Sequence, residues 1–79
     1  MKKYVIELRD DKEVVVKTFI FDEEDDINAL FKAQKMARES VNMKFDGGGM
    51  FVNEKITERE LFFINDKNDM IQYTLRIIE

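Results

Sequence analysis

The order of apolar and polar positions predicts two strands, then one helix, then three more strands. Tyr4, Ile6 and Leu8 recur at every second position, which is the period of a β-strand, and so indicate the first strand. A polar break at residues 10–12 suits a short turn, and residues 13–21 form a second segment rich in β-branched and aromatic side chains. Both faces of this second segment are largely apolar, so we expect it to lie in the middle of a sheet.

A helical period follows, over residues 22–41. Its inner positions recur at spacings of three and four residues, at Ile27, Leu30, Phe31, Gln34, Ala37 and Val41. Alanines at 29, 33 and 37 add helix propensity and allow a close approach to a sheet. Asp22 is the expected N-cap, because a carboxylate at that position accepts hydrogen bonds from the free N–H groups of the first turn.

Three further strands are expected after the helix. Residues 42–49 contain every glycine of the chain and predict an irregular connection with positive φ angles. Strands are expected over residues 50–56, 60–64 and 70–78, the last two forming a hairpin around residues 65–69.

The predicted order is therefore β-β-α-β-β-β, in a single domain over residues 1–79. The corresponding fold class is α+β, with one antiparallel sheet and the helix packed on one face. One helix does not cover every apolar side chain of such a sheet, so we expect an interface or a loop over some of them. The residues concerned are Val15, Phe19, Phe21, Met70 and Ile78.

The composition excludes several kinds of chemistry. The chain contains neither cysteine nor histidine, so disulfides, thiolate ligands and histidine-based catalysis are excluded within this chain. Few carboxylates have the apolar neighbours that acid–base catalysis needs. We therefore expect a protein that is not an enzyme and that uses no cofactor.

No apolar run approaches the roughly 20 residues of a transmembrane helix. The N-terminal apolar segment is short and is interrupted by Glu7 and Arg9, unlike a signal peptide. These features predict a soluble cytoplasmic protein that makes no contact with a membrane.

The charge is uneven along the chain. The formal net charge is −4, and residues 10–26 contain eight acids against two lysines. The acids that we single out as candidate partner-binding residues are Asp10, Asp11, Glu13, Asp22, Glu23, Glu24, Asp25 and Asp26.

The run at residues 22–26 has three interpretations. Acids at a helix start complement the positive end of its dipole, which is a purely local role. Together with the acids at 10–13 they can instead form a surface for a basic protein, like phosphates along a nucleic-acid backbone. A divalent metal is the third interpretation, but the run lacks the spacing of an EF-hand loop, so we predict no metal site.

Two other features have mainly structural interpretations. The glycines at 47–49 follow a helix and lack the Gly-Lys-Ser/Thr of a phosphate-binding loop. Phe62 and Phe63 point to opposite faces of a strand, so one of them can be exposed and anchor a partner. No basic groove accompanies the aromatic rings, so we expect no direct contact with nucleic acid.

In overall character the chain resembles small phage-encoded inhibitor proteins, including anti-CRISPR and related anti-defence proteins. The likeness covers the whole chain and rests on its shortness, its lack of cysteine, its acidity and its layout around the helix at residues 22–41. It implies stoichiometric inhibition of a nucleic-acid-handling host protein, in the host cytoplasm, through the acids of residues 10–26. The alternative hypothesis is a self-associating structural or regulatory module, such as a homodimer, that uses an apolar sheet face or an edge strand.

Overall fold

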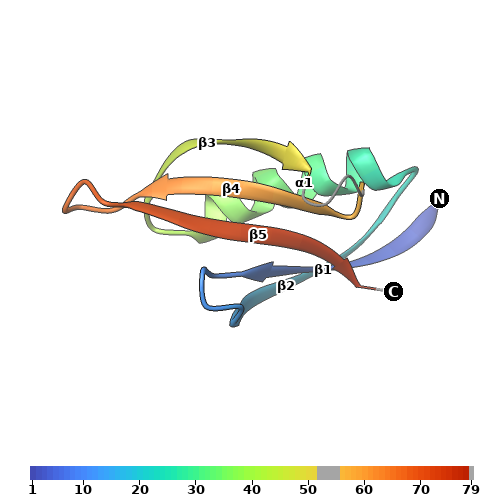
Figure 1. Cartoon of the computed structure of the whole chain (residues 1–79). Coiled ribbons are helices and arrows are strands. Elements are labelled where there is room, and N and C mark those ends of the chain that lie inside the picture. The colour runs from blue at the N-terminus through green and yellow to red at the C-terminus, as the bar shows by residue number, and fades with distance from the viewer. Residues whose placement is uncertain (52–55, 79) are drawn as a thin grey trace.

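A computed structural model describes residues 1–51 and 56–78 of the chain. The elements are β1 (Lys2–Arg9), β2 (Val15–Glu23), α1 (Asp26–Ser40), β3 (Lys44–Phe51), β4 (Glu58–Ile64) and β5 (Met70–Ile78). The strands form one five-stranded antiparallel sheet in the order β2-β1-β5-β4-β3. The helix packs against one face of this sheet and lies behind it in Figure 1. The predicted α+β architecture and the order of its elements are confirmed.

The core is a single layer of side chains between the helix and the sheet. The alternation of β1 is confirmed, because Tyr4, Ile6 and Leu8 are all buried while their neighbours Val5 and Glu7 are half-buried. The same alternation buries every second residue of β4. The buried apolar residues are Tyr4, Ile6, Leu8, Phe19, Ala29, Leu30, Ala33, Ala37, Leu61, Phe63 and Leu75.

The helix begins later than the sequence predicts. Asp25, not Asp22, is the N-cap, and its Oδ1 accepts a hydrogen bond from the backbone N–H of Asn28 at 2.8 Å. Asp22 and Glu23 belong instead to β2. They stay in the strand because they pair with lysines of β1, where the sheet hydrogen bonds and the opposite charges favour extended backbone.

The residues of the helix that face the sheet differ in part from those that the sequence predicts. Ile27 and Phe31 are 41% and 48% exposed, whereas Ala29, Ala33 and Ala37 are fully buried. Small side chains let the helix approach the sheet closely, so the alanine row faces the strands and the two larger residues lie on the flank of the helix.

The predicted central position of β2 is wrong, because β2 is an edge strand. One of its faces lies under the helix and buries Phe19, with Phe21 packed against the core. These two residues belong to the five apolar residues of which some were expected to lie outside the cover of the helix. On the other face Ile20 is 60% exposed, so apolar residues on both faces do not imply that both are covered.

The glycine-rich segment is a strand and not an irregular connection. Gly47 and Gly48 pair with β4 inside β3, which ends at Phe51. The predicted strand at residues 50–56 was therefore placed too late, and residues 52–55 lie outside the described part of the chain. Glycine suits this strand because β4 passes very close to it: a Cβ on Gly48 would lie 2.8 Å from the backbone oxygen of Glu60.

The C-terminal hairpin matches its prediction. β5 covers residues 70–78, and the turn is closed by Asn65, whose side chain accepts hydrogen bonds from the backbone N–H groups of Lys67 and Asp69. In the part of the chain that the structure describes, no helix is long and apolar enough to cross a membrane.

Candidate functional site

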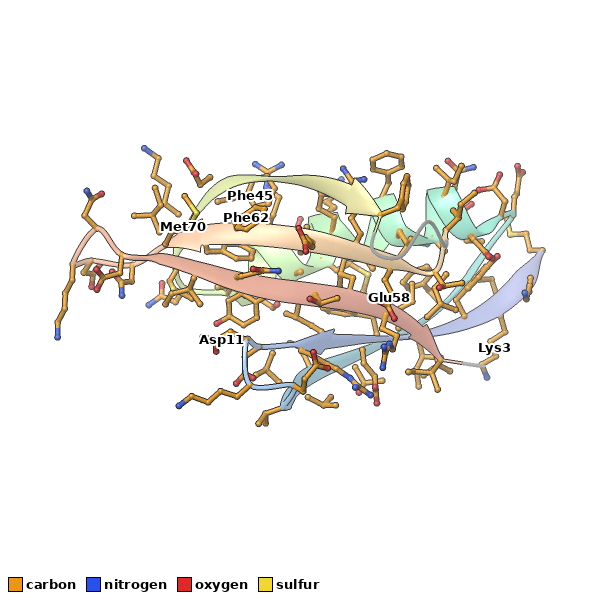
Figure 2. All side chains as sticks on the ribbon, in the orientation of Figure 1. Lys3, Asp11, Phe45, Glu58, Phe62 and Met70 are labelled. Atoms are coloured by element: carbon orange, nitrogen blue, oxygen red, sulfur yellow. The ribbon has the colours of Figure 1, made fainter. Side chains whose placement is uncertain are left out.

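The eight candidate acids fall into two groups at opposite ends of β2. One group lies in the turn between β1 and β2, and the other lies where β2 leads into the helix. Figure 2 labels one residue near each end, Asp11 and Lys3, and Lys3 pairs with Asp22 in the sheet. A strand of nine residues extends about 30 Å at roughly 3.3 Å per residue. The acids therefore form two separate ends of one edge strand and not one continuous cluster.

In the turn group, two of the three acids have local partners. Asp10 Oδ1 accepts hydrogen bonds from the backbone N–H groups of Lys12 at 2.8 Å and Val14 at 3.0 Å, which shapes the turn. Glu13 Oε2 lies 3.4 Å from Arg9 Nη1 in an ion pair. Asp11 is exposed, and no hydrogen bond or ion pair of its carboxylate involves another described residue.

In the helix-start group, three of the five acids have local partners. Asp25 caps the helix, Asp26 Oδ1 accepts a hydrogen bond from the Tyr4 hydroxyl at 2.7 Å, and Glu23 Oε1 accepts one from the next backbone N–H at 3.0 Å. Asp22 and Glu24 are exposed and make no such contact with the described residues. Asp11, Asp22 and Glu24 are thus the candidate acids whose carboxylates form no hydrogen bond or ion pair with another described residue.

The Tyr4 hydroxyl connects this acidic group to the core. Tyr4 is 2% exposed, and its hydrogen bond to Asp26 raises its pKa to about 12, with further contributions from burial and from the charges of Asp26, Asp25 and Glu23. The neutral phenol is therefore strongly preferred in the folded protein.

This preference predicts a loss of stability at high pH. An unfolded tyrosine ionises near pH 10, so the contribution of Tyr4 is complete below pH 10 and is lost as the pH rises from 10 to about 12. The Tyr4→Phe variant should show a weaker decrease over this range when chemical denaturation is measured at each pH. Tyr73 serves as the control. Its pKa is also raised by burial, and because it remains in the variant, its contribution to the pH dependence should be the same in both proteins. An unchanged pH dependence in Tyr4→Phe would contradict the role of this contact.

The outer edge of β2 lies between the two groups of acids. Val15, Val16 and Ile20 are 42%, 48% and 60% exposed, and no described strand pairs with this edge. An open hollow of about 390 Å³ runs beside it, between β2 and the end of the helix. The lining residues are Lys17, Thr18, Phe19, Ile20, Met36, Glu39 and Ser40.

A residue that the sequence analysis did not select, Arg59, lies on the helix-facing side of β4. It is 8% exposed, and its Nε donates a hydrogen bond to Gln34 Oε1 at 2.7 Å. Burial lowers its pKa from the usual arginine value, yet the guanidinium stays charged. Its alternation with Leu61 and Phe63 was the one signal in the sequence that placed it on the inner face.

Among the described residues no three acidic side chains gather closely enough to hold a metal ion. Comparisons of the chain with protein-family models, with curated proteins and with solved structures gave no match.

Proposed function

We propose that this protein is a non-catalytic binding module that receives an extended segment of a basic protein partner along the free edge of β2. The observation that supports this proposal is the edge strand β2, whose outer side pairs with no described strand and which has three exposed aliphatic residues, Val15, Val16 and Ile20. Such edges form main-chain hydrogen bonds with an added strand, and Lys17 is the only basic residue of β2 that would discourage this pairing.

The two acidic groups define the chemistry of the partner. They lie at the two ends of the edge, where they attract an extended segment with lysine or arginine near each end. Complementary charge of this kind raises association rates and selects against acidic partners. The module would then occupy a basic surface on which a nucleic acid otherwise binds, and would act as a stoichiometric inhibitor, as the likeness to phage anti-defence proteins implies.

Self-association is less well supported. Pairing two copies antiparallel through β2 places the turn acids of one copy beside the helix-start acids of the other, so like charges meet at both ends. The uncovered sheet face is also a poor dimer surface, because it carries two ion pairs. The ion pairs are Arg9–Glu7 and Arg76–Glu58, each at 2.6 Å.

Neutralising the three acids without local partners tests the proposal. The triple variant D11N/D22N/E24Q leaves the turn, the helix cap and the Tyr4 contact intact. Because an exposed ion pair contributes about 0.2–1 kcal/mol, the variant should bind a basic strand-forming peptide of alternating lysine and valine about tenfold more weakly. Binding is measured by calorimetry at several salt concentrations, and the salt dependence should weaken together with the affinity.

A matched control changes the net charge equally at acids away from β2. D46N/D66N/D69N alters exposed residues of β3 and of the β4–β5 turn, and it should bind nearly as the parent protein does. Hydrogen exchange of the backbone amides should slow in β2 when the peptide is bound. Equal losses in the two triple variants, or protection confined to β3, would overturn the proposed site.

A further inference from the structure

A hollow opens near the middle of β2, on the side of the sheet that the helix covers. It has a volume of about 390 Å³ and lies between residues 17–20 of the strand and the C-terminal end of the helix. Every second side chain of a strand points to the same face of its sheet. A strand added at the β2 edge would therefore direct one side chain near its middle into this hollow.

The floor of the hollow is apolar. Phe19 is 3% exposed and pairs with the buried Ile6, so it points toward the helix, and Met36 is half-buried and packs against the core. The Ser40 hydroxyl donates a hydrogen bond to the backbone oxygen of Ala37 at 3.0 Å, so its polar group is already engaged. Such a surface favours an apolar side chain, and the flexible methionine adapts to the shape of its neighbour.

The charges that line the hollow balance each other. Lys17 from the strand and Glu39 from the helix are both exposed and carry opposite charges. A charged side chain that entered between them would be attracted by one group and repelled by the other, whereas an aliphatic side chain is indifferent to both. The middle of the edge therefore differs from its two ends, where the acidic groups favour basic residues.

From these contacts we infer that the hollow selects a large aliphatic side chain, leucine or methionine, at the centre of the added segment. This selection rests on the proposed function and defines the partner further: a basic residue near each end, with one aliphatic residue between them that faces the helix. Main-chain pairing with an edge strand is nearly independent of sequence, and side-chain pockets beside the edge supply the specificity. The hollow thus distinguishes segments of equal charge.

The probes are peptides as long as β2, with lysine at both ends, a single variable residue at the centre and threonine elsewhere. Threonine favours extended backbone and offers no large aliphatic group. In calorimetry, the peptide with central leucine should bind about tenfold more tightly than the peptide with central alanine. A fully buried methylene contributes about fourfold, and the open hollow covers only part of the side chain. A central lysine should bind no more tightly than alanine.

The contact itself is measured by NMR. The ε-methyl signal of Met36 should shift when the leucine peptide binds, and nuclear Overhauser contacts should connect it to the leucine methyl groups. The alanine peptide should shift the backbone amides of β2 and give no such contact.

Filling the hollow tests the same contact in the protein. Ser40→Phe changes an exposed residue that lines the hollow, so it should abolish the preference for leucine over alanine. Lys35→Phe is the matched control, because it introduces the same ring at an exposed helix position that does not line the hollow. It should keep the tenfold preference, since the change of charge acts on all peptides alike. If Ser40→Phe does not fold, the Met36 signal decides the matter.

The outcomes separate this selection from the proposed function. Peptides that protect the β2 amides from hydrogen exchange but bind equally, whatever their central residue, would overturn the selection alone. Tightest binding of the central lysine, or a leucine preference that survives in Ser40→Phe, would have the same consequence. Failure of every peptide to protect the β2 amides would overturn the proposed function as well.

Discussion

Replacing Phe63 by alanine is expected to lower the free energy of unfolding by about 3–5 kcal/mol. Phe63 is fully buried at the centre of an aromatic group, with edge-to-face contacts to Phe45 and Tyr73 at 5.4 Å between ring centres. Its removal takes away both contacts and leaves a cavity under the helix. A chain of this length is stable by roughly 4–12 kcal/mol, so the variant should be partly unfolded in water.

The adjacent Phe62 provides a matched control for this experiment. It lies on the other face of β4, is half-buried and is not part of the core cluster. Phe62→Ala removes the same atoms from the same strand and should cost only about 1 kcal/mol. Urea denaturation of both variants measures the difference, and equal losses would contradict the assignment of the two faces.

The second large effect is expected at Gly48, where alanine should cost about 1–3 kcal/mol. The added Cβ would lie 2.8 Å from the backbone oxygen of Glu60 and 2.9 Å from Leu61 Cδ2. A leucine side chain can turn away, but the backbone oxygen belongs to the paired strand and moves only with it. We expect β3 to separate from β4 near this position.

Gly47→Ala is the control for this substitution. A Cβ on Gly47 would meet nothing within 4 Å, and replacing glycine without strain stabilises by about 0.4–1 kcal/mol through the unfolded chain. Thermal denaturation should therefore move in opposite directions for the two variants, and hydrogen exchange in β3 should accelerate only in Gly48→Ala. Similar losses in both would mean that β3 requires glycine generally and not close packing at one point.

The candidate acids illustrate how far a charge pattern can be interpreted. The charge pattern identified the eight carboxylates, and we predicted that they form a single acidic surface. Five of them make local contacts, which depend on where β2 ends and where the helix begins. The boundary between β2 and the helix is set by the pairing of β1 with β2. Asp22 and Glu23 belong to the strand because lysines of β1 lie opposite them.

Elements whose contacts are local were predictable. β5 and its turn follow from strict alternation and from an asparagine that closes the turn by itself. The position of β2 was not predictable in the same way. Its neighbour β1 pairs on the other side with β5, which joins residues 5–9 to residues 74–78, and this contact between the chain ends leaves β2 at the edge.

By itself the sequence determined the order of the elements, the fold class and the alternation of buried residues along β1. These features follow from the spacing of apolar side chains along one segment, because that spacing fixes which residues share a face of a helix or strand. Only the tertiary structure decided that β2 is an edge strand, that the glycines lie within β3 and that Arg59 lies between Phe31 and Phe51. Those features depend on which distant segments pack together, and a pattern along one segment carries no information about its neighbours in space.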